Sequence, residues 1–186
     1  MITEELSRLF KERLSKNARY AEALDLVRKN SEGKIWLMGG TVYKGLINIL
    51  YGFDYTSKDF DFIVEKEITP FKYNGWDLRG SRFGSPKFIK NDLIVDFVSI
   101  NNIYAIKTRN LPGIIENYLK TVPLSIHSVV FDIQDEKLIG DIGINSILSK
   151  TIFIQNKEHY EICRLMYADK HDLEKNAQLF GFKIIE

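Results

Sequence analysis

The chain has 186 residues, of which 45% are hydrophobic, with 26 basic and 25 acidic side chains. This length and apolar content predict one globular domain with a sizeable core. The net charge of +1 excludes a large electrostatic footprint for nucleic acid. The single cysteine, Cys163, excludes an internal disulfide. The first residues lack the apolar stretch of a signal peptide, and no apolar run approaches the roughly 20 residues that span a bilayer. We therefore expect a cytoplasmic protein with no membrane partner.

The N-terminal third of the chain predicts helices before a strand–helix–strand unit. Apolar residues recur at helical spacing over 3–27, which indicates one long amphipathic helix or two consecutive helices. A strand is expected at 34–38, a helix at 41–51 that ends at Gly52, and a second strand at 59–65.

The remainder alternates irregularly between strands and helices. Segment 67–83 is rich in Gly, Pro and charged residues and predicts an irregular excursion with at most a short strand. The further expected elements are a β-hairpin of 87–90 and 93–100 that turns at Asn91-Asp92, a helix at 112–121, strands at 126–133, 137–139 and 151–154, and a mainly helical 157–180 closed by Gly181. This order indicates an α+β fold with a mixed sheet.

The most informative stretch is 36–65. Strand residues alternate sides, so Asp59 and Asp61 should project together, while the phenylalanines between and after them point into a core. The Gly39-Gly40 pair lets a phosphate approach the backbone where the following helix presents its N–H groups. Taken alone, each pattern is commonly a solvated pair or a tight turn. Their order and spacing indicate a metal–nucleotide site.

A third carboxylate lies in the apolar segment LIVDFVSI. Burying an unpaired Asp96 there would cost several kcal/mol, and a metal ion on the same face would remove this cost. The alternative is an aspartate at a strand edge or one paired with a nearby Lys or Arg. Arg79 and Arg82 are candidates for phosphate contact, with ordinary solvated arginines as the alternative.

These residues resemble the polymerase-beta-like nucleotidyltransferase superfamily, and in particular the head domain of bacterial poly(A) polymerases and CCA-adding tRNA nucleotidyltransferases. That branch begins Gly-Gly-X-Val-Arg-Asp and continues to Asp-X-Asp, against GGTVYKGL and DFDF here. The segment SIHSVVFDIQDEKLIGDIGINSIL follows the rhythm of the later family motifs, and QLFGFKI resembles the start of the family's neck.

The resemblance implies a nucleotidyltransferase fold, a mixed sheet flanked by helices, with extra N- and C-terminal helices. It implies a helical segment at 1–32, a head domain at 33–155 and a neck-like helix at 156–186. It also implies that Asp59, Asp61 and Asp96 are catalytic and bind Mg²⁺, with two ions expected. The nucleotide-binding residues expected from the match are Gly39, Gly40, Thr41, Lys44 and His127.

The chain departs from the family at positions that grip the triphosphate. Tyr43 and Lys44 stand where the family has Arg-Asp, residues 121–123 replace its Arg-Arg-Asp, and His127 replaces an asparagine. Lys44 or His127 could compensate. The base-reading neck motif has no clean counterpart around 158–172. The sequence ends where the family's body and tail domains would begin, so we expect the tRNA body-binding domains to be absent.

Two main functions follow as hypotheses. The first is an Mg²⁺-dependent nucleotidyltransferase that transfers a nucleoside monophosphate from an NTP to a hydroxyl of a small molecule, a protein or an RNA end. The alternative is a catalytically lapsed protein of the same fold that acts as an RNA- or protein-binding module. A structural α+β scaffold with coincidental aspartates is a third hypothesis, which leaves the ordered match unexplained.

Overall fold

The computed structural model describes residues 2–55, 57–80, 85–167 and 171–186. Within these ranges a mixed seven-stranded sheet has the order β3-β4-β5-β2-β1-β6-β7. Strands β2 and β5 run parallel, and the other neighbouring pairs are antiparallel. The strands are β1 (Ser31–Met38), β2 (Asp59–Glu67), β3 (Asp77–Gly80), β4 (Pro86–Lys90), β5 (Leu93–Ser99), β6 (Val130–Asp132) and β7 (Lys137–Ile139). The mixed sheet expected from the irregular element order is confirmed.

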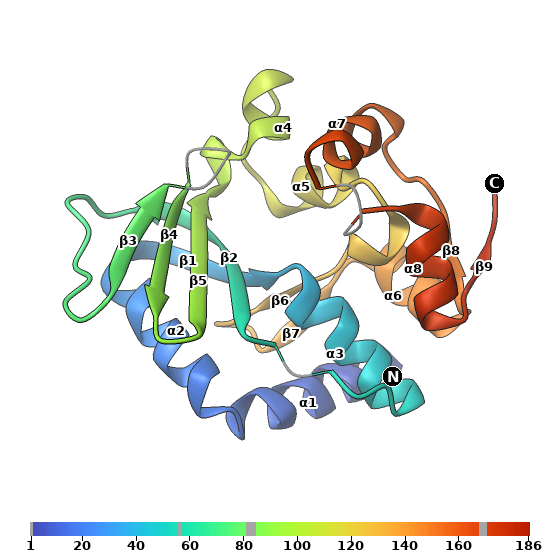
Figure 1. Cartoon of the computed structure of the whole chain (residues 1–186), viewed down its shortest axis with the longest axis horizontal. Helices are drawn as coiled ribbons and strands as arrows, with labels where there is room; N and C mark the ends of the chain where they lie inside the picture. Colours follow the sequence, from blue (N-terminus) through green and yellow to red (C-terminus); the bar gives the residue numbers. More distant parts are fainter. Residues whose placement is uncertain (1, 56, 81–84, 168–170) are drawn as a thin grey trace.

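The N-terminal segment forms two consecutive helices, α1 (Ile2–Ser15) and α2 (Ala18–Lys29). The break occurs at Asn17, whose side-chain oxygen accepts hydrogen bonds from the backbone N–H groups of Arg19 and Tyr20 and so caps α2. Figure 1 shows both helices along one side of the sheet.

The central unit follows the sequence closely. Helix α3 (Gly40–Tyr51) ends at Gly52, which has the left-handed conformation typical of a helix C-terminus. Strands β4 and β5 form the expected hairpin, and Asn91 adopts a positive φ of 55° at its turn. The excursion before the hairpin contains the short strand β3 at the edge of the sheet.

Several predicted elements differ in extent from the observed ones, and two of these differences have a clear structural cause. Of the strand expected at 126–133 only β6 forms, and a short 3₁₀ helix, η2 (Ser125–His127), lies before it. The backbone turns there because Leu124 pairs with Ile154 and Ser125 N–H donates to the Phe153 carbonyl, which draws this segment away from the sheet.

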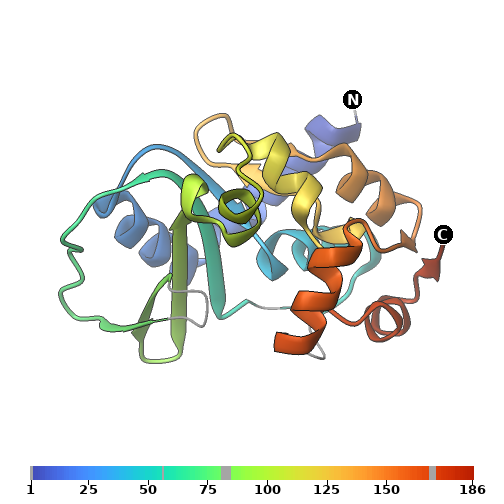
Figure 2. The ribbon, with the colours of Figure 1, turned by 90° about the horizontal axis from the view of Figure 1, so that it is seen from above.

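The second correction concerns the C-terminal helix. It is divided into α7 (Lys157–Tyr167) and α8 (Leu173–Phe180), and the Asp172 side chain caps α8. The remaining elements are η1 (Ile100–Asn102), α4 (Tyr104–Thr108), α5 (Ile115–Thr121), α6 (Asp141–Leu148), and a separate parallel pair, β8 (Thr151–Ile152) and β9 (Lys183–Ile184). Figures 1 and 2 place the C-terminal elements at the opposite end of the molecule from strands β3 and β4. Among the described residues no helix is both long and apolar enough to cross a membrane.

The two faces of the sheet carry different layers. Phe60 and Phe62 are fully buried in the large core that α1, α2 and α3 close. Ile63, on the other face of β2, belongs to a smaller cluster with Leu119 of α5. Because side chains alternate along a strand, Asp59 and Asp61 lie on the same face as Ile63, away from the large core.

Candidate metal and nucleotide site

Three charged residues form a row across neighbouring strands. Asp61 of β2 is the register partner of Asp96 of β5, and Asp96 is in turn the partner of Lys87 of β4. Directly paired residues point to the same face of a sheet. We call Lys87, Asp96 and Asp61 the charged row. Asp59, two residues before Asp61, shares this face, and Arg79 of β3 lies opposite Lys87 in the next register position.

Lys87 forms an ion pair with Asp96, with a distance of 3.1 Å between Nζ and Oδ2. The Asp96 side chain is only 18% exposed. Burial alone would lower the pKa of Lys87, but the carboxylate of Asp96 and, after it, those of Asp61 and Asp59 raise this pKa above its ordinary value. The ammonium group therefore interacts electrostatically with all of the predicted metal ligands.

The carboxylates share a face but do not converge. Within the described part of the chain, no three His, Cys, Asp or Glu side chains are grouped closely enough to hold a metal ion. The donor set nevertheless suits a hard cation, because Mg²⁺ takes carboxylate oxygens. Asp59, Asp61 and Asp96 are the residues that would hold it after their side chains draw together.

Gly39 brings the start of α3 against this row. It has φ 72° and ψ −152°, a backbone region that is essentially restricted to glycine. A Cβ atom at Gly39 would lie 2.8 Å from Asp61 Oδ2. The α3 helix then begins at Gly40. The N–H groups of Val42 and Tyr43 donate to the Gly39 carbonyl, so Gly40 and Thr41 carry the first-turn N–H groups that have no acceptor within the helix. The space beside Gly39 is thus occupied by the Asp61 carboxylate, and the phosphate contact expected at Gly39-Gly40 stays a prediction.

Thr41 has a structural role at the start of β2. It is buried, and its hydroxyl lies 2.8 Å from both the Ser57 hydroxyl and the Asp59 carbonyl oxygen. These contacts join the first turn of α3 to the strand that carries the aspartates. Direct nucleotide contact by Thr41 stays a prediction.

Lys44 lies one turn into α3, where its side chain folds back over the helix start. Its Nζ is 4.6 Å from the centre of the Tyr55 ring, a cation–π geometry. A Cβ at Gly40 would lie 3.9 Å from Lys44 Cε and 3.3 Å from the Tyr55 hydroxyl oxygen. Lys44 and Tyr55 therefore border the same point of the backbone.

His127 is buried rather than presented to solvent. Its ring lies 4.8 Å from that of Tyr43 and 5.3 Å from that of His171. Burial, followed by the charges of His171 and Lys44, lowers the pKa of His127 well below its ordinary value, so the ring is neutral. It packs against Tyr43 of α3. Its predicted contact with a nucleotide stays a prediction.

Sequence reasoning missed several neighbours of the aspartates. No sequence motif marks Lys87 as the partner of Asp96, because the register between β4 and β5 brings the two residues together. Tyr55 and Tyr118 come from segments with no motif, yet burial raises the pKa of both phenols, and the charge of Asp61 adds to this effect in each case. The Tyr118 hydroxyl also donates to Met38 Sδ, the register partner of Asp61 on β1. Arg82 lies outside the described residues.

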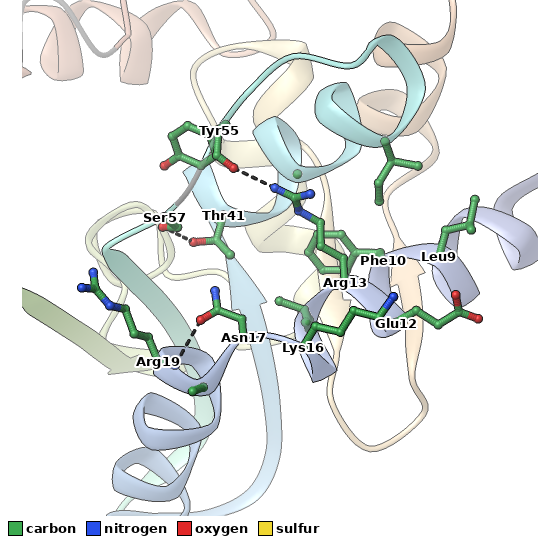
Figure 3. A pocket seen from close by; sticks show the side chains of 14 residues that line it. Leu9, Phe10, Glu12, Arg13, Lys16, Asn17, Arg19, Thr41, Tyr55 and Ser57 are labelled. Carbon is green, nitrogen blue, oxygen red and sulfur yellow. Dashed lines mark hydrogen bonds between the residues drawn. The ribbon is translucent and has the colours of Figure 1, made fainter.

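A cavity of about 630 Å³ lies behind the start of β2, between the N-terminal helices and α3 (Figure 3). Arg13 spans its rim, and its guanidinium donates to the Asn48 side chain and the Tyr55 carbonyl. Thr41 is the one predicted site residue among those that line it. The other lining residues are Leu9, Phe10, Glu12, Arg13, Leu14, Lys16, Asn17, Ala18, Arg19, Gly45, Ile49, Tyr55 and Ser57. The cavity is therefore separate from the charged row.

This fold is the nucleotidyltransferase fold of CCA-adding enzymes, as the resemblance predicts. The particular structures it resembles include a tRNA-processing enzyme with CTP (TM-score 0.55, 18% identity), a CCA-adding enzyme with CTP (0.57, 17%) and the Thermotoga maritima CCA-adding enzyme complexed with tRNA (0.53, 17%). Each match covers 82% of this chain but only 40%, 36% and 35%, respectively, of the other chain. No protein-family model and no curated protein sequence matches.

Proposed function

We propose that this protein is an Mg²⁺-dependent nucleotidyltransferase that transfers a nucleoside monophosphate from an NTP to a hydroxyl acceptor. The observation that carries the proposal is the register of Asp61 with Asp96 on neighbouring parallel strands, beside the glycine that opens α3. This arrangement places oxygen donors for a hard cation next to a helix start suited to a triphosphate. The proposed ligands and the glycine all lie within 33–155, the proposed head domain.

The chain's own groups would act mainly by positioning. Asp59, Asp61 and Asp96 would hold the ions, which supply charge neutralisation at the entering and leaving oxygens when bound. The backbone at Gly39 and Gly40 would hold the triphosphate through first-turn N–H groups. Phosphoryl transfer of this kind depends on orientation and electrostatic stabilisation more than on covalent chemistry by the protein.

The experiment that tests the reaction supplies each α-labelled NTP with Mg²⁺ and total RNA, protein or small-molecule fractions. We expect label in one fraction with the wild type and none with Asp61→Asn, because the amide cannot replace a charged metal ligand. The labelled fraction would identify the acceptor class. No label in any fraction with a folded wild type would contradict the proposed activity.

A second candidate is the binding module, an RNA- or protein-binding protein that has lost catalysis. The observation that favours it is the burial of Thr121 and Val122, which stand where the family has arginines that grip the triphosphate. Neither side chain can supply a positive charge. Retained Mg²⁺ binding without transfer of label to any fraction would favour this candidate.

The metal site makes a separate prediction. A ligand that binds only the folded state at about 100 times its Kd stabilises that state by about 2.7 kcal/mol. We expect saturating Mg²⁺ to raise the melting temperature of the wild type and to leave Asp61→Asn unchanged. Differential scanning fluorimetry over an Mg²⁺ titration measures this, with Asp54→Asn, outside the proposed ligand set, as the control. An equal rise in Asp61→Asn would contradict the assignment of this ligand.

A further inference from the structure

We propose that Lys87 is an internal cation that occupies the carboxylate site of the metal-free protein, and that a divalent cation binds there by displacing it. The inference rests on the proposed function, because it assumes that Asp59, Asp61 and Asp96 bind metal. It adds a residue that neither the motif match nor the fold comparison assigns, and it explains why the carboxylates share a face without converging.

The position of Lys87 is set by the sheet itself. It is the register partner of Asp96, which is the register partner of Asp61, so the ammonium group and both carboxylates project from one face of three adjacent strands. The backbone beneath it is firmly held, since Phe88, the next residue, is fully buried and stacks on Phe97 of β5 with ring centroids 5.2 Å apart. The backbone of β4 is thus held in place, while the Lys87 side chain is 36% exposed and can move.

The electrostatics favour this occupancy. Neighbouring carboxylates repel one another, and an ammonium among them offsets this repulsion. The 3.1 Å contact between Lys87 Nζ and Asp96 Oδ2 places the ammonium beside one of these carboxylates, and the sheet register places Asp61 on the neighbouring strand. The Lys87 ammonium supplies one positive charge where a divalent ion would supply two.

The chemistry of lysine also permits its displacement. Its charge sits on a flexible four-carbon stem, and the Lys87 side chain is 36% exposed, so the ammonium can swing into solvent without moving the strand. A divalent cation must then break the 3.1 Å contact with Asp96 before this carboxylate can turn toward it. The consequence is a metal affinity lower than the three carboxylates alone would give.

The test measures Mn²⁺ binding by water-proton relaxation in full-length variants. We expect Lys87→Gln to bind Mn²⁺ about fivefold to tenfold more tightly than the wild type, because the competing charge is gone. Lys87→Arg keeps the charge and should bind no more tightly than the wild type. Lys90→Gln is the matched control: it removes a cation from the same strand, but one that pairs with Glu22 at 2.6 Å, and we expect no change.

A second readout keeps the inference falsifiable if metal binding is too weak to titrate. Without metal, Lys87→Gln should melt at a lower temperature than the wild type, because the ion pair between Lys87 and Asp96 is lost. Saturating Mg²⁺ should restore more of this variant's stability than it adds to the wild type. An Mg²⁺-dependent stabilisation no larger in Lys87→Gln than in the wild type would overturn the inference.

The outcomes separate the two proposals. Wild-type Mn²⁺ binding that Asp61→Asn abolishes, with equal or weaker binding in Lys87→Gln, would overturn the role of Lys87 and leave the metal site standing. Tighter binding in Lys87→Arg as well as Lys87→Gln would also overturn it, because charge would not be the cause. No Mn²⁺ binding and no Mg²⁺-dependent stabilisation in any folded variant would overturn both the metal site and the inference that rests on it.

Discussion

At the scale of single residues, Gly39 links the two halves of the site. Its positive φ and its contact distance to Asp61 are separate constraints, and both exclude a side chain. We expect Gly39→Ala to lower the free energy of unfolding by about 1–3 kcal/mol through backbone strain. It should also abolish Mg²⁺-dependent stabilisation, because the new methyl group displaces the Asp61 carboxylate.

Gly52→Ala is the control for strain alone. Gly52 also has a positive φ, of 69°, but a Cβ there would meet nothing within 4 Å. This variant should lose stability in urea denaturation and keep the full Mg²⁺ effect in the thermal titration. If Gly39→Ala also keeps the full effect, Gly39 has no role beyond forming the turn.

At the scale of elements, α3 is held by its packing on α1. A Cβ at Gly45 would lie 2.7 Å from Cε2 of Phe10, whose ring makes an edge contact with Phe131 at 5.2 Å. Helix propensity alone favours Gly45→Ala by about 1 kcal/mol, whereas overpacking costs about 1–3 kcal/mol. We expect a net loss of about 1 kcal/mol in the free energy of unfolding, measured by urea denaturation.

A double-mutant cycle with Phe10→Leu checks the cause. The smaller leucine should leave room for the added methyl group, so Gly45→Ala should cost less, or stabilise, in that background. Equal costs in both backgrounds would show that helix–helix contact is not the reason.

The elements also show what sequence could predict. The periodicity of apolar residues and the turn residues were sufficient to predict β2, α3 and the β4–β5 hairpin, because local sequence patterns specify these elements. The prediction of a strand over 126–133 was wrong in its first half, because Leu124 and Ser125 pair with Ile154 and Phe153. These contacts join residues far apart in the sequence, so a local pattern does not indicate them. The sequence analysis offered a nearby Lys or Arg as the alternative partner of Asp96, and the ion pair with Lys87 confirms that alternative. The sequence could not identify which residue it is, because periodicity assigns faces but not register between strands.

At the scale of the whole molecule, buried histidines couple stability to pH. Burial lowers the pKa of both His127 and His159 in the folded state, so the unfolded chain takes up protons first as pH falls. Stability from these groups is complete above about pH 6.5, the ordinary histidine pKa, and decreases below it. We expect the free energy of unfolding to fall between pH 7 and pH 5.

Urea denaturation at several pH values measures this dependence. His127→Phe, which keeps an aromatic ring against Tyr43, should flatten the decrease. His159→Phe is a second variant on a separate element, α7. An unchanged slope in both variants would assign the pH dependence to other groups.

The register of the sheet makes the site sensitive to insertions and deletions in a way that substitutions do not reveal. Asp96 lies between Val95 and Phe97, both buried on the opposite face. Removing one residue from β5 before Asp96 would exchange these faces, turning the carboxylate into the apolar core and a hydrophobic side chain toward Asp61. In related proteins of this fold, the number of residues between the start of β5 and its aspartate should therefore indicate an intact site better than the presence of the three aspartates alone.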